Sequence, residues 1–277
     1  MKGSLYIVGT PIGNLGDISP RAAQTLGDVD FIAAEDTRVS IKLLNHLGIK
    51  KPLVSYYEHN KKYSGEKILA RMEGGESCAL ITDAGMPAVS DPGYELVKAC
   101  AEAGIETIVI PGPSALIAAI AGSALPSGRF TFEGFLSTAK QSRFRHLEEL
   151  RGEKRTMIFY EAPHKLLQTL RDMLDAFGNR EISIARELTK IHEEFIRTTL
   201  TGAIEHFELT IPRGEFVLVL SGTPEDEKAP MPVDEALKAV NAYRAEGNSL
   251  RKAAELAATE TGYSKNELYS LYVKTNG

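Results

Sequence analysis

Short apolar runs alternate with helix start and stop signals through the first half of the chain. The apolar runs lie at residues 5–8, 31–34, 52–55, 79–82 and 105–110. The helix signals between them are Ser19-Pro20, Thr37 with Gly48, and Asp91-Pro92 with Gly104. Ser, Thr and Asp cap helix N-termini, Pro suits the first helical position, and Gly ends helices. The alternation predicts a mainly parallel α/β domain over residues 1–117.

The pattern changes near residue 130 to more strand signals with fewer helix signals. Apolar runs lie at residues 130–135, 156–160, 182–185, 195–200 and 216–220. One clear helix signal follows Pro163. We therefore expect a second domain of the α+β class over residues 118–222. The cleft between two such domains is a favoured place for a small-molecule site.

The last part of the chain has a third pattern. Residues 223–232 read as a linker, because the stretch SGTPEDEKAPMP at 221–232 is polar, acidic and rich in proline. Three short helices are predicted after it: one from Asp234 to Gly247, one from Ser249 to Gly262, and one opened by a capping box of Ser264 with Glu267. Residues 233–277 thus resemble a helix-turn-helix module. Their six acidic and six basic residues leave open whether the module contacts nucleic acid or covers a protein surface.

The charge of the chain changes this picture locally. The net charge of −5 argues against a protein whose whole surface attracts nucleic acid, but a local basic patch remains compatible with it. Seven basic and four acidic residues lie between Arg129 and Arg155, and the segment KQSRFRHLEELRGEKR at 140–155 is locally positive. This segment is a candidate for contact with phosphate groups.

The sequence carries no signal for a membrane segment, a disulfide or a metal site. The longest weakly polar stretch, residues 115–125, is too short to span a bilayer, and the first strand begins by Leu5 without room for a signal peptide. Cys78 and Cys100 are expected to be small buried apolar residues. The six histidines form no i, i+4 pair. We expect a cytoplasmic protein without a bound metal.

A glycine-rich turn, VGTPIGNLGD at residues 8–17, follows the first apolar run. Pro11 stands where the dinucleotide fingerprint needs its second glycine, and Asp17 stands where a P-loop needs lysine. The turn is therefore expected to bind a ligand without phosphate. Two further Gly/Pro loops follow strands, ITDAGMPAVSDPG at 81–93 and IPGPSA at 110–115. All three would emerge at one edge of a parallel sheet and present backbone groups there.

A cluster of charged residues and one serine near these loops can each be interpreted in more than one way. Glu35, Asp36 and Arg38 follow the second strand, where a Rossmann fold keeps its ribose-binding acid and where other open α/β sheets place ligands, but Asp36-Thr37 is also a good helix start. Ser114 lacks the surroundings of a nucleophile elbow. It reads as a helix N-cap or as a hydroxyl group that faces a ligand.

Taken in order, seven motifs resemble the tetrapyrrole methylase superfamily of S-adenosylmethionine-dependent enzymes. The motifs are YIVGTPIGNLGDIS, AAEDTR, ITDAGMPAVSDPG, IPGPSA, YEAPHK, ARELTKIHEE and RGEFVLVL. The resemblance covers essentially the whole chain. It implies the class III methyltransferase fold, with two α/β domains, the cofactor in the cleft between them, and a homodimer. The cofactor carries a sulfonium and an amino acid but no phosphate, in agreement with the first turn.

Within the superfamily, the motifs are most similar to those of the bacterial enzymes that methylate 16S rRNA. That similarity implies methylation of a cytidine 2′-hydroxyl in the decoding region, with the 30S subunit as the expected partner. Many tetrapyrrole-modifying relatives have Gly-Asp-Pro where this chain has Gly85, Met86 and Pro87. This difference argues against a tetrapyrrole as the substrate. It also leaves the role of Asp83 open. The alternatives are a tetrapyrrole or other small-molecule methyltransferase and a ligand-sensing, DNA-binding regulator.

The resemblance also implies site residues. The expected cofactor contacts are Pro11, Asp83, Gly85, Pro87, Val89, Ser114, Ala115, Ala162, Leu188, Gly214 and Glu215. Candidate proton acceptors for the hydroxyl group are Asp36, Glu161 and Glu187, and a structural ion pair is an equally good reading of Glu187. Candidates that would hold phosphates or polarise the hydroxyl are Arg38, Lys165, Arg186 and Lys190. Arg143 and Arg145 are expected to contact RNA phosphates along the basic segment.

Overall fold

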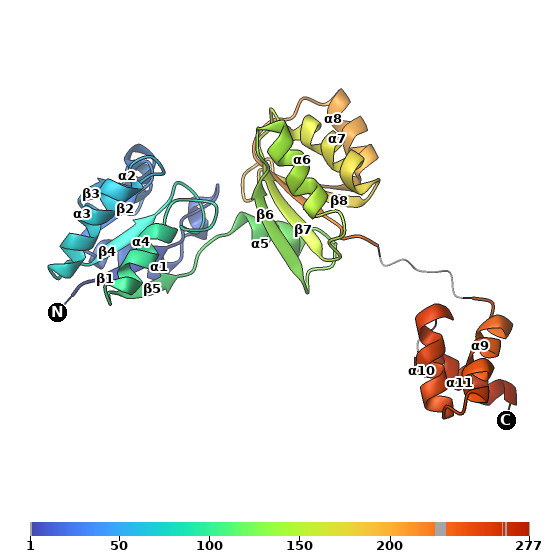
Figure 1. Cartoon of the computed structure of the whole chain (residues 1–277). Coiled ribbons are helices and arrows are strands. Elements are labelled where there is room, and N and C mark those ends of the chain that lie inside the picture. Colours follow the sequence, from blue (N-terminus) through green and yellow to red (C-terminus); the bar gives the residue numbers. More distant parts are fainter. Residues whose placement is uncertain (1, 225–230, 262, 264, 277) are drawn as a thin grey trace. The chain divides into compact units, whose positions relative to one another are not determined.

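The computed structural model describes residues 2–224, 231–261, 263 and 265–276 (Figure 1). The chain divides into two compact units, which we call unit 1 (Met1–Thr223) and unit 2 (Pro224–Gly277). Over its described residues, unit 1 contains two five-stranded sheets and unit 2 contains three helices. No helix formed by these residues combines the length and the apolar character that crossing a bilayer requires.

The first sheet is fully parallel, as the alternation of strand and helix signals predicts. Its strands are β1 (Ser4–Val8), β2 (Phe31–Ala34), β3 (Leu53–Ser55), β4 (Cys78–Ile81) and β5 (Glu106–Ile110), in the order β3-β2-β4-β1-β5. Each begins and ends within one residue of its predicted run. Helices α3 (Lys61–Glu73) and α4 (Tyr94–Glu102) pack on one face, and α1 (Pro20–Asp28) and α2 (Thr37–His46) pack on the other. The strands are apolar throughout because both faces of the sheet are covered.

The helices of this half depart from the predictions in two places. The N-cap of α2 is Asp36, whose carboxylate accepts the backbone N–H of Arg38 at 2.8 Å, so Thr37 is the first helical residue and not the cap. Helix α4 begins three residues after Asp91, with Gly93 at its N-cap position. Asp91 is therefore free of a capping role.

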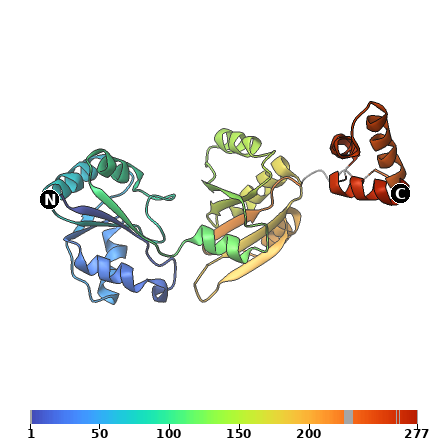
Figure 2. The same cartoon turned by 90° about the horizontal axis from the view of Figure 1, so that it is seen from below.

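The second sheet is mixed. Its strands are β6 (Phe130–Phe135), β7 (Thr156–Glu161), β8 (Glu181–Arg186), β9 (Glu194–Thr199) and β10 (Phe216–Leu220), in the order β6-β7-β10-β8-β9. Strands β6 and β7 are parallel, and the other neighbours are antiparallel. Helix α5 (Ala115–Gly122) packs on one face, and α6 (Lys140–Glu149), α7 (Leu166–Phe177) and α8 (Leu200–Leu209) pack on the other (Figure 2). The five predicted strands and the helix after Pro163 are confirmed.

Helices α6 and α8 were not predicted, because both escape the apolar pattern. Helix α6 buries only Leu147, so its sequence shows no apolar stripe. Helix α8 begins at Leu200, which the pattern assigns to the preceding strand, and the Thr199 hydroxyl caps it by accepting the Gly202 N–H at 3.3 Å. The predicted domain boundary after residue 117 runs through α5, which contacts β7, β8 and β10. The division of unit 1 into two domains stays a prediction.

Unit 2 forms α9 (Val233–Ala245), α10 (Leu250–Thr261) and α11 (Lys265–Asn276). Small side chains such as Ala253 and Ala257 let the helices approach around Val240 and Leu268. Helix α9 begins one residue before Asp234, and Ser249 caps α10 as predicted, accepting the Lys252 N–H at 3.3 Å. Two residues of the predicted stop and capping signals, Gly262 and Ser264, lie outside the described residues.

Candidate active site

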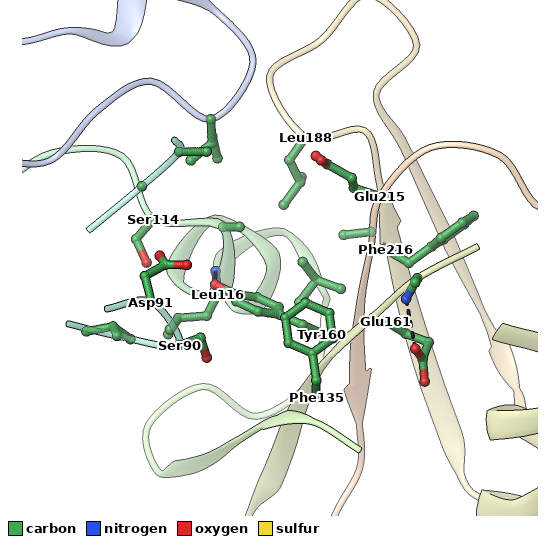
Figure 3. Close-up of a pocket in the computed structure, with 18 of the residues that line it drawn as sticks. Ser90, Asp91, Ser114, Leu116, Phe135, Tyr160, Glu161, Leu188, Glu215 and Phe216 are labelled. Atoms are coloured by element: carbon green, nitrogen blue, oxygen red, sulfur yellow. Dashed lines mark hydrogen bonds between the residues drawn. The ribbon is translucent and has the colours of Figure 1, made fainter. Parts of the chain in front are cut away.

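A cavity of ≈ 410 Å³ in unit 1 is lined by the loops after β1, β4 and β5 and by the ends of β6, β7, β8 and β10 (Figure 3). We call it the main cavity. It opens at the carboxyl ends of the parallel strands, where α/β sheets place ligands. Seven of the eleven expected cofactor contacts line it: Gly85, Val89, Ser114, Ala115, Ala162, Leu188 and Glu215.

The three Gly/Pro loops of the first sheet meet backbone to backbone, at one edge as predicted. A Cβ atom on Gly9 would lie 2.7 Å from the Gly112 Cα, so neither position accepts a side chain. Thr10 and Gly85 exchange backbone hydrogen bonds of 2.9 and 3.1 Å. The Thr10 hydroxyl also donates to the Thr82 carbonyl at 3.1 Å. This part of the wall is therefore built from tightly joined backbone.

Ser114 combines its two predicted readings. It occupies the N-cap position of α5, but its side chain makes no capping hydrogen bond. The side chain lines the main cavity instead (Figure 3). Its hydroxyl group is thus available to a ligand.

Four expected cofactor contacts do not line the main cavity: Pro11, Asp83, Pro87 and Gly214. Each is a direct neighbour in sequence of a residue that does. Asp83 is exposed, and its carboxylate accepts the backbone N–H of Asp36 at 3.1 Å. Partial desolvation of its carboxyl group raises the pKa of Asp83, and the negative charge of Asp36 adds to the effect.

Asp36 and Arg38, two predicted catalytic residues, pair with each other away from the main cavity. The Arg38 guanidinium lies 2.6 Å from the Asp36 carboxylate, and the Arg38 side chain is 87% exposed. Hydrogen bonds from the Arg38 side chain and backbone lower the pKa of Asp36 to about 2. A carboxylate of such low basicity is poorly matched to proton abstraction near neutral pH. Asp36 acts as the cap of α2.

Glu187 and Lys190 support the wall without lining it. The Lys190 ammonium lies 2.9 Å from a carboxylate oxygen of Glu187 and 2.9 Å from one of Glu215. The Glu215 N–H donates to the same Glu187 oxygen at 2.9 Å, and the hydrogen bond from Lys190 lowers the pKa of Glu187. The ion-pair reading of Glu187 is the one that this geometry favours.

The backbone of the same loop is strained. Glu187 and Thr189 have φ values of +51° and +66°, a region that non-glycine residues adopt at a cost of about 1–3 kcal/mol each. Between them, buried Leu188 projects into the main cavity. Gly214 has φ +91°, and a Cβ there would lie 2.5 Å from the Glu187 carboxylate. The charged network thus holds a strained loop that places Leu188 in the wall.

Glu161 is the one predicted catalytic residue that lines the main cavity. It ends β7 and is 3% exposed. One carboxylate oxygen accepts the Ala162 N–H at 2.8 Å, and the other accepts the Thr169 hydroxyl at 2.5 Å. Both oxygens are therefore occupied within the fold, which favours a positioning role.

Asp91 is a candidate functional residue that the sequence reasoning missed. Its carboxyl group lies beside Ser114 in the main cavity and accepts no hydrogen bond from the residues that the structure describes (Figure 3). Burial, together with the negative charges of Glu35 and Asp83, raises the pKa of Asp91 to about 7. The sequence signal was the pair Asp91-Pro92, read only as a helix start.

An aromatic wall opposite the Gly/Pro loops was also missed. The ring of Phe135 lies edge-on to that of Tyr160, with centroids 5.5 Å apart, and is 56% exposed. The Tyr160 hydroxyl accepts the Leu116 N–H at 3.2 Å, which fixes the ring against the start of α5. An apolar ring with a hydrogen-bonded end gives the cavity a rigid face.

Comparison with known proteins identifies the family of the chain. The sequence profile described as Tetrapyrrole (Corrin/Porphyrin) Methylases matches residues 4–203. The chain belongs to this family. Solved methylases confirm the fold: a cobalt precorrin-4 methyltransferase has a TM-score of 0.59 at 18% identity, covering 78% of this chain and 94% of that one. The uroporphyrin-III-C-methyltransferase of Thermus thermophilus has a TM-score of 0.56 at 19% identity, covering 79% and 94%.

Within the tetrapyrrole methylase family, several curated relatives share one name, "Ribosomal RNA small subunit methyltransferase I". The Synechocystis protein is 50% identical over 97% of both chains, and the Halalkalibacterium halodurans protein is 46% identical over 98% of this chain and 95% of its own. The Thermotoga maritima protein is 52% identical over 220 residues, which cover 79% of this chain and 99% of its own.

The methyl donor of this family is S-adenosylmethionine, and the main cavity fits it. Three carboxyl groups, from Asp91, Glu161 and Glu215, line the cavity, and its described lining contains no Lys, Arg or His. Such a wall suits a cationic ligand and disfavours a pyrophosphate. When bound, the donor supplies a methyl carbon activated by a positive sulfonium. Gly85, Ser114 and Leu188 would hold it with backbone, hydroxyl and apolar contacts.

Proposed function

We propose that the protein methylates the 2′-hydroxyl of a cytidine ribose in the decoding region of 16S rRNA. The observation that carries the proposal is the name of its relatives, which match this chain over both units at 46–50% identity. The carboxyl groups that line the main cavity support S-adenosylmethionine as the methyl donor. The seven sequence motifs support the choice of the cytidine 2′-hydroxyl.

The reaction requires alignment before anything else. Methyl transfer to a hydroxyl group is an in-line displacement, and well-oriented reacting groups are worth about 7–11 kcal/mol of the barrier. The closely joined loops of the first sheet and the fixed ring of Tyr160 supply rigid walls on two sides of the main cavity. Leu188 and Phe216 add apolar surface that excludes water from the reacting atoms.

Asp91 is the residue we propose as the proton acceptor. Its carboxylate faces the main cavity without a partner among the described residues, whereas Asp36 and Glu187 are ion-paired and Glu161 is hydrogen-bonded at both oxygens. A raised pKa near neutrality makes the carboxylate a stronger base than an ordinary aspartate. A carboxylate oxygen of Asp91 would take the 2′-hydroxyl proton as the oxygen–carbon bond forms.

We propose further roles for the other predicted residues from the family resemblance. Pro11, Asp83, Pro87 and Gly214 would shape the loops whose neighbours touch the cofactor. Val89, Ala115 and Ala162 would contact it directly from the wall. The active form would be a homodimer that works in the cytoplasm on the 30S subunit, and light scattering after size-exclusion chromatography tests the dimer.

Methyl transfer to ribosomal subunits tests the proposed function. Labelled S-adenosylmethionine is supplied with the protein and either 30S subunits lacking native modifications or naked 16S rRNA, and the RNA is digested to nucleosides. We expect label in 2′-O-methylcytidine. Label on a base or on another ribose would overturn the stated position. No label on either RNA, together with binding of a coloured macrocycle, would support the tetrapyrrole alternative.

A further inference from the structure

A second cavity, of ≈ 170 Å³, adjoins the main one. It lies between the segment that follows β6 and the start of α7, and Ser137, Thr138, Gln168 and Thr169 form part of its lining. Glu161, the last residue of β7, lines both cavities. The two cavities are therefore neighbours across the carboxyl end of β7.

The second cavity, unlike the first, is lined by basic side chains. Arg143, His164 and Lys165 line it, and Glu161 is the acidic residue in its described lining. The Glu161 oxygens already accept hydrogen bonds from Ala162 and Thr169. Neither the Lys165 ammonium nor the His164 ring has a hydrogen bond or an ion pair with the described residues. Two side-chain donors are thus free to meet an anion in this cavity.

Arg143 has partners within the fold. Its guanidinium lies 2.6 Å from the Asp172 carboxylate, whose side chain is 4% exposed. A second nitrogen donates to the carbonyl oxygens of Ser137 and Thr138 at 3.2 and 3.3 Å. Arg143 therefore fixes the segment that closes one side of the cavity, and its predicted contact with an RNA phosphate stays a prediction.

We propose that the second cavity binds a phosphate group of the RNA strand next to the nucleotide held in the main cavity. The inference rests on the proposed function. A nucleotide whose ribose enters the carboxylate-lined cavity carries phosphates that must lie outside it, because like charges repel. The cationic cavity across Glu161 accepts one of them. Lys165 and His164 contact the phosphate, and the Arg143 pairings hold the cavity in shape.

The carboxylate of the cofactor is the other source of an anionic group near this position. The two sources of the anionic group predict different effects on RNA affinity and on cofactor affinity. A phosphate of RNA contributes to RNA affinity and to its dependence on salt, whereas the cofactor carboxylate contributes to cofactor affinity alone.

Variants of the two side-chain donors test the inference. Binding of 16S rRNA is measured over a range of salt concentrations for the wild type, Lys165→Gln, His164→Gln and the control Lys62→Gln. Lys62 is an exposed lysine on α3 that lines neither cavity, so the control removes the same charge elsewhere. We expect Lys165→Gln to lower the slope of log affinity against log salt by about 0.7–0.9, the value for one lost phosphate contact. We expect Lys62→Gln to leave it unchanged.

Kinetics and cofactor binding complete the test. Lys165→Gln should raise KM for 30S subunits about 3–10-fold, leave kcat within about twofold, and leave the S-adenosylmethionine Kd unchanged, because the lysine positions RNA and does not touch the reacting atoms. A slope equal to that of Lys62→Gln overturns the inference. So does a weaker cofactor Kd with unchanged RNA binding, which would assign the cavity to the cofactor carboxylate.

Failure of the inference is distinguishable from failure of the proposed function. If the wild type methylates 30S subunits and Lys165→Gln behaves like the control, only the phosphate site is wrong. If the wild type binds RNA with a slope that depends on Lys165 but transfers no methyl group, the phosphate site stands and the reaction is wrong. If the wild type binds no RNA, the phosphate site is overturned as well.

Discussion

The two sheets of unit 1 meet the main cavity in different ways. The first sheet contributes closely joined loops, in which Gly9, Gly112 and Thr10 fix the backbone. The second contributes side chains, including Tyr160, and a strained loop held by a charged network around Lys190. One sheet thus presents backbone geometry and the other presents side-chain chemistry. Ser114 and Asp91 are exceptions, because their side chains face the main cavity from loops of the first sheet, and we place Asp91 at the reacting atoms.

Asp91→Asn gives the largest expected effect on catalysis. Loss of a general base lowers kcat by about 10²–10⁴-fold. In the wild type, kcat should rise with pH through about 7, because the active form is the carboxylate and burial raises its pKa to that value. The variant should lose this rise.

Glu161→Gln is the comparison for Asp91→Asn. It changes a carboxylate of the second sheet that already accepts two hydrogen bonds. Its kcat should keep the rise with pH. If the rise of kcat with pH disappeared in Glu161→Gln and persisted in Asp91→Asn, Glu161 would be the proton acceptor and Asp91 would not.

Arg143→Ala should cost about 3–5 kcal/mol of unfolding free energy, the range for removal of one partner of a buried ion pair. The change leaves the Asp172 carboxylate, 4% exposed, without its guanidinium. Urea denaturation measures the loss. Arg145→Ala, on the exposed side of α6, should change stability by less than about 0.5 kcal/mol. Equal stability of the two variants would contradict the structural role of Arg143.

Gly9→Ala tests the backbone side of the comparison. The added methyl group would meet Gly112 at 2.7 Å, and overpacking of this kind costs about 1–3 kcal/mol. We expect the joined loops to separate and cofactor affinity, measured by calorimetry, to fall about 10–100-fold. Gly128→Ala is the control, since no atom lies within 4 Å of its added methyl group. Normal cofactor binding by Gly9→Ala would show that the loops need not touch.

Gly214→Ala tests the strained loop of the second sheet and should have the smallest effect. Its methyl group would press on the Glu187 carboxylate and loosen the loop that carries Leu188. We expect cofactor affinity to fall about 5–10-fold, which corresponds to the lower end of the about 1–3 kcal/mol range for such strain. Gly178→Ala has a similarly positive φ of +73° but no atom within 4 Å, so the difference between the variants isolates the contact with Glu187. Equal cofactor affinities in the two variants would show that the contact with Glu187 does not affect cofactor binding.

The sequence predicts the elements that have a local signal in their own residues. All ten strands formed by the described residues follow from apolar runs, and the three Gly/Pro loops follow from residues that favour turns. Helix α6 was missed because one buried residue, Leu147, leaves no periodic pattern to read. Helix α3 gave no signal either: its N-cap, Asn60, makes no side-chain capping bond.

The site is predictable where a motif lies on one loop and not where partners come from distant segments. Gly85, Ser114 and Leu188, which line the main cavity, were expected from the family resemblance of motifs that each lie on one loop. The ion pair of Arg143 depends on Asp172, 29 residues away on another helix. The pKa of Asp91 depends on burial, on Glu35 from the segment after β2, and on Asp83 from the start of its own loop. Charge in a sequence shows which side chains are ionisable, but only the fold shows which of them are already paired.

The backbone-built half of the main cavity also bears on resistance to inhibitors. A compound whose polar groups bind the backbone at Ala84 and Gly85 meets atoms that no side-chain substitution removes, and Gly9 and Gly112 accept no larger residue. A compound that depends on Phe135 or Leu188 can lose its contact through a single codon change. Escape mutations should therefore gather on the second sheet.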